Sequence, residues 1–281
     1  MYEETHKEMH DYDIAIVGGG MVGLTLANLL AESDFSIVVL DLNPPRQKIS
    51  AKDRLRVSAI SRASQNILKA VNCWTDKIQA QSCAYDKMTV WDELSSGHLH
   101  FDAAALGEPD IGHIVPNADL RLALWQRLIE QPNVSLMAPV KLDKAQWHEQ
   151  GVQISLEDDE DVTAKLAIAA DGAHSWLRQQ AGVAMHEASY DHVALVASIA
   201  TSKPHGHCAR QVFLDSGPLA FLPLKNDQEC SIVWSAPPDK VQQLANMSDN
   251  EFEQALSSAF GAHLGKLSLI SERATFPLIG R

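Results

Sequence analysis

The chain has 281 residues, of which 46% are hydrophobic, and this is enough to build one large domain or two smaller ones. Its 36 acidic and 23 basic residues give a formal net charge of −13, which argues against a nucleic-acid binder and leaves no polybasic surface for anionic lipid. The 4 cysteines form no CxxC pair, so a zinc ribbon, a thioredoxin motif and a dense disulfide framework are disfavoured, and a reducing cytoplasm is expected.

An uncharged run over residues 14–31 is 18 residues long, which reaches the length of a candidate membrane-spanning helix. Gly18, Gly19 and Gly20 interrupt this run. Each glycine in a helix interior costs about 1 kcal/mol relative to alanine. Two buried elements joined by a glycine turn therefore explain the run better, and no transmembrane segment is expected.

The first predicted elements are a short apolar strand over residues 13–17, a helix over 21–31 and a second strand over 35–40. This order is typical of the opening βαβ unit of a dinucleotide-binding fold. The turn after the first strand reads Gly-Gly-Gly-Met-Val-Gly over residues 18–23, which satisfies the pattern GxGxxG.

Each position of this motif has a physical role. Gly18 permits the tight turn, Gly20 lets a pyrophosphate approach the backbone, and Gly23 lets the helix pack closely on the strand. Asp41 ends the second strand, where a carboxylate can accept hydrogen bonds from ribose hydroxyls. Because a carboxylate there disfavours a 2′-phosphate, the unit predicts FAD or NAD and not NADP, and it leaves the first two open.

Further elements follow in chain order. They are a helix over residues 64–71, strands over 87–91 and 98–101, a helix capped by Asn117 or Asp119 that ends before Pro132, and strands over 134–137, 152–156 and 162–169.

A second motif begins where the last of these strands ends. It reads DGxxSxxR, from Asp171 to Arg178, and opens a helix. Asp171 can orient a neighbouring polar group, Gly172 permits a close backbone approach, and Ser175 with Arg178 can anchor the start of the helix. Taken alone, Asp-Gly is a common turn.

After Val183 the pattern changes to strands without intervening helices, over residues 193–200, 211–214, 219–224 and 230–234. This pattern predicts an antiparallel sheet in a separate layer that covers a substrate. A capping box at Ser248 and Glu251 then begins a helix.

The two motifs together resemble those of the flavoprotein aromatic hydroxylases, in which a Rossmann-like domain holds FAD. That family carries GxGxxG near its N-terminus and a DG motif about 150 residues later; here Asp171 follows Gly18 by 153 positions. Arg56, in the segment Asp-Arg-Leu-Arg-Val-Ser-Ala-Ile-Ser, resembles the family's arginine that reaches the FAD and is a better match than Arg54. Arg121 matches a family position that faces the flavin phosphates or ribityl chain, with a solvated first-turn residue as the alternative.

Within this family, essentially the whole chain from Asp13 to Arg281 is similar to the bacterial ubiquinone-biosynthesis hydroxylases, and the branch acting at C5 of the polyprenylphenol ring is the most similar. The segments that carry this resemblance are residues 56–60, 112–115, 123–125, 169–178, 209–213, 220–224 and 230–234. The resemblance implies an α/β fold, with a Rossmann-like FAD-binding domain over residues 1–78 and 105–183. A second, mostly antiparallel β-sheet substrate domain would comprise residues 79–104 and 184–281.

The resemblance also implies an activity: a monooxygenase that uses FAD, O2 and NADH or NADPH to hydroxylate the ring of a polyprenylphenol. Three alternatives stay open: hydroxylation of another ring position in the same pathway, a non-catalytic fragment acting as a scaffold, and an NAD-dependent dehydrogenase. The dehydrogenase predicts a second βαβ half. No catalytic residue is assigned, because the flavin supplies the difficult chemistry.

The substrate ring and its prenyl tail are expected on the apolar face of the second sheet. The residues concerned are Phe213, Phe221, Leu222, Pro223 and Trp234. The alternative for each is an ordinary place in the core of the sheet. No metal is expected, because no acid or cysteine completes the histidine pairs 98/100 and 205/207.

The implied partners are a polyprenylphenol-type lipid and O2. Peripheral association with the inner membrane, a complex with other ubiquinone-biosynthesis proteins and a homo-oligomer stay open. The family's next landmark is a Gly-Asp motif, and no Gly-Asp dipeptide occurs in the 281 residues. The sequence therefore leads to the expectation that the C-terminal part of the FAD domain is absent, and that this chain folds but holds little flavin and lacks hydroxylase activity.

Overall fold

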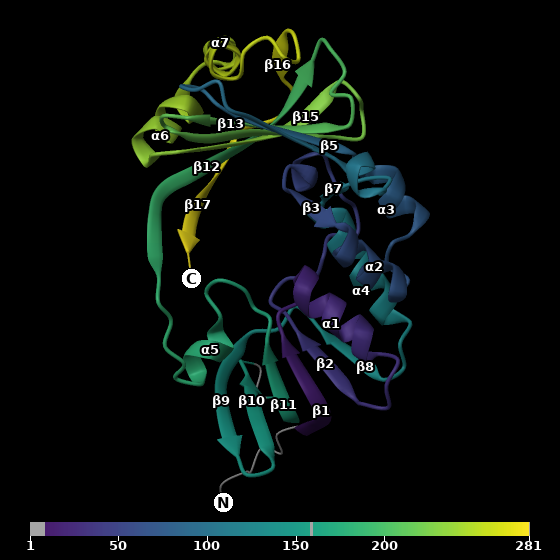
Figure 1. The fold of residues 1–281 in the computed structure, drawn as a ribbon. Coiled ribbons are helices and arrows are strands. Elements are labelled where there is room, and N and C mark those ends of the chain that lie inside the picture. The colour runs from purple at the N-terminus through teal and green to yellow at the C-terminus, as the bar shows by residue number, and fades with distance from the viewer. Residues whose placement is uncertain (1–8, 158–159, 281) are drawn as a thin grey trace, which may run out of the picture. The chain divides into compact units, whose positions relative to one another are not determined.

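A computed structural model describes residues 9–157 and 160–280, and these form two compact units (Figure 1). Unit 1 comprises the described residues up to Lys48 together with Ala70–Cys73 and Leu120–His186. Unit 2 comprises Ile49–Lys69, Trp74–Asp119 and the described residues from Glu187 onward. The segments 49–69, 74–78 and 105–119, which the sequence assigned to the FAD-binding part, thus group with the second sheet.

Unit 1 is built on a six-stranded mixed sheet with the strand order β8-β2-β1-β11-β10-β9. Its strands are β1 (Met9–Val17), β2 (Ile37–Leu40), β8 (Val134–Met137), β9 (Leu142–His148), β10 (Gly151–Leu156) and β11 (Asp161–Ala169). β8, β2, β1 and β11 run parallel, whereas β11, β10 and β9 are antiparallel. The expected strand-turn-helix-strand opening is present, with α1 (Met21–Leu30) between β1 and β2.

The interior of unit 1 explains why these strands are apolar. Val17, Val38 and Ile154 are at most 2% exposed and belong to one core with Leu177 of α5 (Trp176–Gln180). Burial of each such side chain contributes about 1.5–3 kcal/mol. On α1, Asn28 donates a hydrogen bond of 3.0 Å to the carbonyl of Leu124 in α4 (Asn117–Ile129), which fixes the two helices to each other.

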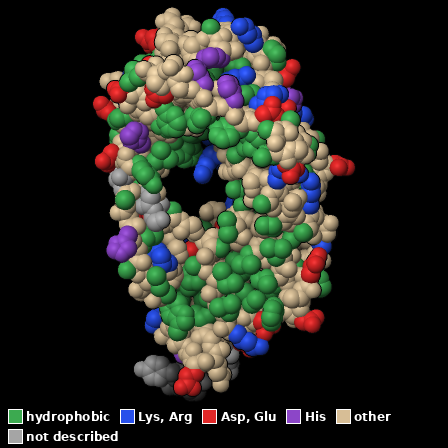
Figure 2. All heavy atoms as spheres, in the orientation of Figure 1, with side chains coloured by type: hydrophobic (Ala, Val, Ile, Leu, Met, Phe, Trp, Pro, Cys, Tyr) green, Lys and Arg blue, Asp and Glu red, His purple; other side chains and the backbone are tan. Residues whose placement is uncertain are grey.

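The glycines divide the uncharged run into β1 and α1, as expected. α1 is 10 residues long, and none of the described helices is long and apolar enough to cross a membrane. Figure 2 shows hydrophobic side chains gathered over the face of unit 1 that carries α1, where Val22 is 77% exposed and Leu29 47%. An exposed apolar surface of this kind is typical of contact surfaces.

Unit 2 is built on an eight-stranded, largely antiparallel sheet, as expected. The path β16-β12-β15-β14-β13-β5-β6 gives its order, and β17 also pairs with β12. Its strands are β5 (Lys87–Asp92), β6 (His98–Asp102), β12 (Ala188–Thr201), β13 (Cys208–Leu214), β14 (Gly217–Pro223), β15 (Glu229–Ala236), β16 (Leu267–Leu269) and β17 (Ala274–Gly280). The exception is the parallel pair of β5 and β13.

Helices α6 (Pro238–Asn246) and α7 (Asp249–Phe260) lie on one side of this sheet (Figure 1). Phe252 and Phe260 of α7 are buried, and the ring of Phe260 stacks on Phe221 with 3.7 Å between centroids. The predicted capping box is present, because Ser248 and Glu251 bond reciprocally to each other's backbone N–H.

A small three-stranded sheet completes unit 2, in the order β3-β7-β4. Its strands are β3 (Val57–Ser61), β4 (Cys83–Tyr85) and β7 (Gly112–Pro116), and the neighbouring helices are η1 (Lys52–Arg54), α2 (Arg62–Ala70), α3 (Asp76–Gln81) and η2 (Ala103–Leu106). On the other side of β1, the described strands β11, β10 and β9 are joined as antiparallel neighbours, so no second βαβ half occurs in this part of the sheet. The feature that an NAD-dependent dehydrogenase predicts is therefore missing there.

Candidate functional site

The glycine loop of unit 1 contains two glycines that packing requires. Gly18 has φ +111°, and a Cβ built on it would lie 2.6 Å from the backbone nitrogen of Asp171. A Cβ on Gly23 would collide with the carbonyl oxygen of Gly18. No side chain fits either place, so α1 can approach the ends of β1 and β11 only with glycine at both positions.

Gly20 differs from its two neighbours, because a Cβ built on it would meet nothing within 4 Å. Gly20 is also the N-cap of α1, and no side chain caps that helix end or places an acid in its first turn. The first N–H groups of a helix and its dipole attract an anion. The space beside Gly20 and the uncapped helix end thus fit a pyrophosphate.

Asp41 and Arg121 are brought together at the same loop. The Asp41 carboxylate accepts hydrogen bonds from the backbone N–H of Gly19 at 2.5 Å and of Asn43 at 2.7 Å, and it lies 3.3 Å from the Arg121 guanidinium. Arg121 in turn donates to the carbonyls of Gly19 at 2.6 Å and Asn43 at 2.5 Å. A carboxylate and a guanidinium therefore stand beside the uncapped end of α1.

The second motif lies at the C-terminal end of β11 in the same unit. Asp171 accepts a hydrogen bond of 3.1 Å from the N–H of Leu177 through one oxygen, and its other oxygen is buried without a partner among the described residues. Ser175 caps α5 by accepting from the N–H of Arg178 at 3.1 Å. Gly172 has φ +81°, and a Cβ there would meet nothing within 4 Å.

A cavity of about 400 Å³ adjoins both motifs. It is lined by Val17, Gly18, Leu40, Asp41, Leu42, Val140, Lys141, Leu142, Glu157, Asp171 and Trp176. A cavity lined by apolar side chains with polar groups at its edge, such as this one, can accommodate a flat heteroaromatic ring. Lys141 and Glu157 form that polar edge as an ion pair of 3.2 Å.

Arg56, the remaining predicted cofactor ligand, belongs to unit 2. Its guanidinium lies over the ring of Phe276, 4.8 Å from the centroid, and its carbonyl accepts from the N–H of Asn117 at 3.0 Å. Its contact with a flavin stays a prediction.

The five predicted substrate residues do not share one surface. Phe221 and Trp234 are 1% and 3% exposed in the core beneath α6 and α7. Leu222 packs in a different cluster with Tyr85, and Phe213 is 45% exposed. The cause is the two-residue period of a strand, which sends consecutive side chains of β14 to opposite faces.

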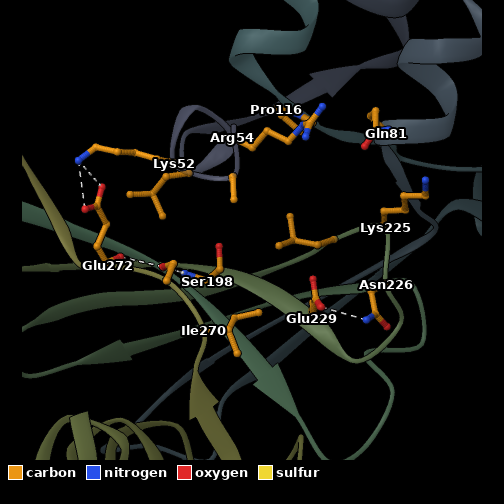
Figure 3. A pocket seen from close by; sticks show the side chains of 14 residues that line it. Lys52, Arg54, Gln81, Pro116, Ser198, Lys225, Asn226, Glu229, Ile270 and Glu272 are labelled. Carbon is orange, nitrogen blue, oxygen red and sulfur yellow. Dashed lines mark hydrogen bonds and ion pairs between the residues drawn. The ribbon is translucent and has the colours of Figure 1, made fainter. Parts of the chain in front are cut away.

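A second cavity, of about 670 Å³, lies within unit 2 (Figure 3). Its lining residues are Ala51, Lys52, Arg54, Leu55, Gln81, Pro116, Ser198, Leu224, Lys225, Asn226, Glu229, Ile270, Ser271 and Glu272. None of the five predicted substrate residues is among them. Sequence reasoning missed this cavity because its walls come from six separated segments of the chain, and the nearest available signal was the strand ending at Leu224.

Arg54 is the most firmly held cation on this wall. Its Nε lies 2.7 Å from one oxygen of Asp119 and its Nη2 lies 2.9 Å from the other. The Asp119 side chain is only 2% exposed, whereas that of Arg54 is 36% exposed. The hydrogen bonds to Asp119 raise the pKa of Arg54 above its ordinary value, so the guanidinium stays charged.

The turn between β14 and β15, which forms the opposite wall, is held by a buried histidine. His205 is 1% exposed, and its Nε2 donates to the carbonyls of Leu224 at 3.0 Å and Asn226 at 3.2 Å. Its Nδ1 accepts from the N–H of His207 at 3.1 Å. Burial lowers the pKa of His205, and the ring is therefore neutral with its proton on Nε2. No group of three or more histidine, cysteine or acidic side chains suited to a metal occurs in the described ranges.

The arrangement defines an α/β protein with a nucleotide-binding loop and a separate, largely antiparallel sheet. Two solved structures show the same fold: PqsL, a probable FAD-dependent monooxygenase from Pseudomonas aeruginosa, and the p-nitrophenol 4-monooxygenase PnpA from Pseudomonas putida DLL-E4. PqsL has a TM-score of 0.76 at 18% identity and covers 96% of this chain and 74% of its own. PnpA has a TM-score of 0.71 at 16% identity and covers 97% and 69%.

The family profile described as "FAD binding domain" matches residues 11–278. The chain is 37% identical over 271 residues to the 3-demethoxyubiquinol 3-hydroxylase of Escherichia coli (strain K12), covering 96% of this chain and 68% of that protein. It is 34% identical to the ubiquinone hydroxylase UbiL of Rhodospirillum rubrum, covering 95% and 61%. It is also 34% identical to the mitochondrial ubiquinone biosynthesis monooxygenase COQ6 of Mus musculus, covering 89% and 55%.

The chain therefore belongs to the FAD-binding-domain family of flavin-dependent monooxygenases and is related to the ring hydroxylases of ubiquinone biosynthesis. It spans between about half and two thirds of the length of these relatives, 55% for COQ6 and 68% for the E. coli enzyme.

Proposed function

We propose that this chain binds FAD and a polyprenylphenol, and that it forms part of a monooxygenase that hydroxylates the phenol ring in ubiquinone biosynthesis. The observation that carries the proposal is the uncapped end of α1 with open space at Gly20, next to Asp41 and Arg121. The names of the relatives, each a ubiquinone or demethoxyubiquinol hydroxylase or monooxygenase, support the substrate class.

In this proposal each part of the loop holds one part of the cofactor. The N–H groups at the start of α1 hold the pyrophosphate, Asp41 accepts from the ribose hydroxyls, and Arg121 neutralises phosphate charge. Asp171 and Gly172 border the same site, and Arg56 contacts the flavin. When bound, FAD supplies the redox and oxygen-activating chemistry, with NADH or NADPH as the electron donor.

The substrate ring is placed in the cavity of about 670 Å³ in unit 2, whose size suits a small aromatic molecule. Leu55, Leu224 and Ile270 exclude water from the ring, and the prenyl tail leaves along the face that carries Leu222 and Phe213. Phe221, Pro223 and Trp234 support the sheet from within and touch no substrate.

The ring position is a finer question. The resemblance of the sequence favours C5, whereas the E. coli relative is named for a hydroxylation at position 3 of demethoxyubiquinol. We therefore propose C5, with hydroxylation of another position in the same pathway as the second candidate.

Hydroxylation can be tested with the purified chain, added FAD, NADH or NADPH, and a short-chain prenylphenol under ¹⁸O2. The proposal predicts a product with one labelled oxygen, which mass spectrometry detects and whose position NMR assigns, and such a product would overturn the expectation from the sequence that this chain holds little flavin and is inactive. The Gly20→Val variant should form none. A labelled product from the variant at the parent's rate would contradict the proposal, and so would its absence from a parent chain that binds FAD.

A further inference from the structure

The cavity of unit 2 combines apolar walls with the guanidinium of Arg54, which is held by Asp119, a residue that does not line the cavity. Leu55, Pro116 and Ile270 supply apolar wall, and Figure 3 shows the Arg54 side chain running along the wall toward Pro116. A cation at the edge of an apolar cavity attracts an oxygen that carries negative charge, because little water competes for it.

The bonds made by Arg54 leave part of its guanidinium available. Asp119 takes Nε and Nη2, and Nη1 has no hydrogen-bond partner among the described residues. Since Asp119 is nearly completely buried, it holds the guanidinium in place while the outer edge stays free for a ligand. A fixed donor of this kind binds with little loss of side-chain freedom.

The other charged groups of the cavity are engaged elsewhere or lie in solvent. Lys52 pairs with Glu272 at 2.9 Å, Glu229 accepts from Asn226 at 3.0 Å, and Lys225 is exposed. Arg54 is therefore the cation best placed to act on a ligand in the cavity.

We propose that Arg54 recognises the ring hydroxyl of the substrate and favours its ionised form. This inference rests on the proposed function, because it assumes that the cavity takes a phenol. The phenol loses its proton to solvent water, and the guanidinium stabilises the phenolate by charge and hydrogen bonding. A phenolate ring is richer in electrons than the phenol and is the better acceptor of an electrophilic oxygen, so Arg54 would set both specificity and reactivity.

The test uses 4-nitrophenol, whose phenolate absorbs visible light, titrated with pH in the presence of the 281-residue chain. Bound 4-nitrophenol should ionise about one pH unit or more below the free compound, the effect of an opposite charge at contact distance. FAD binding by the same preparation is measured separately and decides the proposed function. Lack of a shift in a chain that binds FAD would thus overturn this inference alone.

The variant is Arg54→Gln combined with Asp119→Asn, because Arg54→Gln alone would leave a buried, unpaired carboxylate and could unfold the chain. The matched control is Arg62→Gln with Glu108→Gln, an ion pair of 2.7 Å in the same unit whose arginine is similarly exposed at 35%. The shift should vanish in the Arg54 variant and persist in the control and in Lys225→Gln. An equal shift in the parent and the Arg54 variant, or its loss in Lys225→Gln, would overturn the inference.

Discussion

The three glycines of the loop look alike in sequence but have different physical roles. We predict that Gly20→Val abolishes binding of ADP and FAD and lowers the melting temperature only slightly, because its side chain would enter the space of the pyrophosphate and the only structural loss is a less favourable N-cap of α1. Gly23→Val should instead destabilise the fold, since its Cβ collides with the Gly18 carbonyl.

Calorimetric titration and thermal unfolding distinguish these two outcomes. Gly97→Val is the control, because a Cβ there meets only the Ser95 hydroxyl at 3.3 Å in unit 2. Retention of ADP affinity in Gly20→Val would mean that the loop does not bind the phosphates.

Asp41 provides a second prediction for a single residue. Asp41→Ala should weaken ADP binding by about 1–3 kcal/mol, the usual cost of losing hydrogen bonds to a charged acceptor. It should also loosen the loop, because the carboxylate holds the N–H groups of Gly19 and Asn43. Titration of the variant beside Asp34→Ala, an exposed acid of the same unit, measures the effect. Equal affinities in the two variants would show that Asp41 does not reach the ribose.

At the scale of elements, the turn between β14 and β15 should be sensitive to acid. His205 has a lowered pKa because of burial, against an ordinary value of 6.5. Below about pH 6.5, His205 is therefore protonated in the unfolded chain but stays neutral in the folded chain. The free energy of unfolding consequently decreases as the pH falls through this range. His113 and His263 of unit 2 are shifted in the same direction, also by burial.

Melting temperatures between pH 7.5 and 5.5 test this prediction, with Asp227 and His207 as the titratable neighbours of the ring. His205→Gln keeps a donor for the Leu224 carbonyl and cannot gain a charge, so its melting temperature should fall less steeply with acid than the parent's. His186→Gln, at an exposed position, should follow the parent. The same pH slope in both variants would exclude His205 as a source of the acid sensitivity.

The sequence predicts correctly those elements whose hydrophobic period, turn residues and capping residues all lie within one short stretch of the chain. The glycine turn, β1, α1, β2 and the capping box of α7 were all predicted because period, turn chemistry and capping agree there. The sheet β3-β7-β4 and the parallel pairing of β5 with β13 were not, because both join strands that are distant in the chain. Short strands in which apolar and polar residues do not alternate regularly give little indication of which strand they pair with.

The same distinction applies to the candidate site. Gly18, Gly20, Gly23 and Asp41 are consecutive features of one βαβ unit, so the sequence could assign them roles. The resemblance favours Arg56 over Arg54 as the cofactor ligand, and nothing near Arg54 in sequence shows its buried partner 65 positions away. The alternation along β14 separates Phe221, which stacks on α7, from Leu222, which packs in the cluster with Tyr85.

Across the whole molecule, both units bury their thiols. Burial raises the pKa of Cys73 and Cys83 to about 11 and that of Cys230 to about 12, and Cys208 is also buried. We predict that the native chain reacts negligibly with a thiol reagent at neutral pH and that all 4 cysteines react after unfolding. A fast-reacting thiol in the native chain would contradict the packing of the unit that contains it.

The central claim is that the glycine loop of unit 1 binds the ADP half of FAD. The most direct measurement is a calorimetric titration of the parent chain and of Gly20→Val with ADP, with circular dichroism to confirm that both are folded. The account predicts saturable one-to-one binding to the parent and none to the variant. No binding to a folded parent, or equal binding to both proteins, would contradict it.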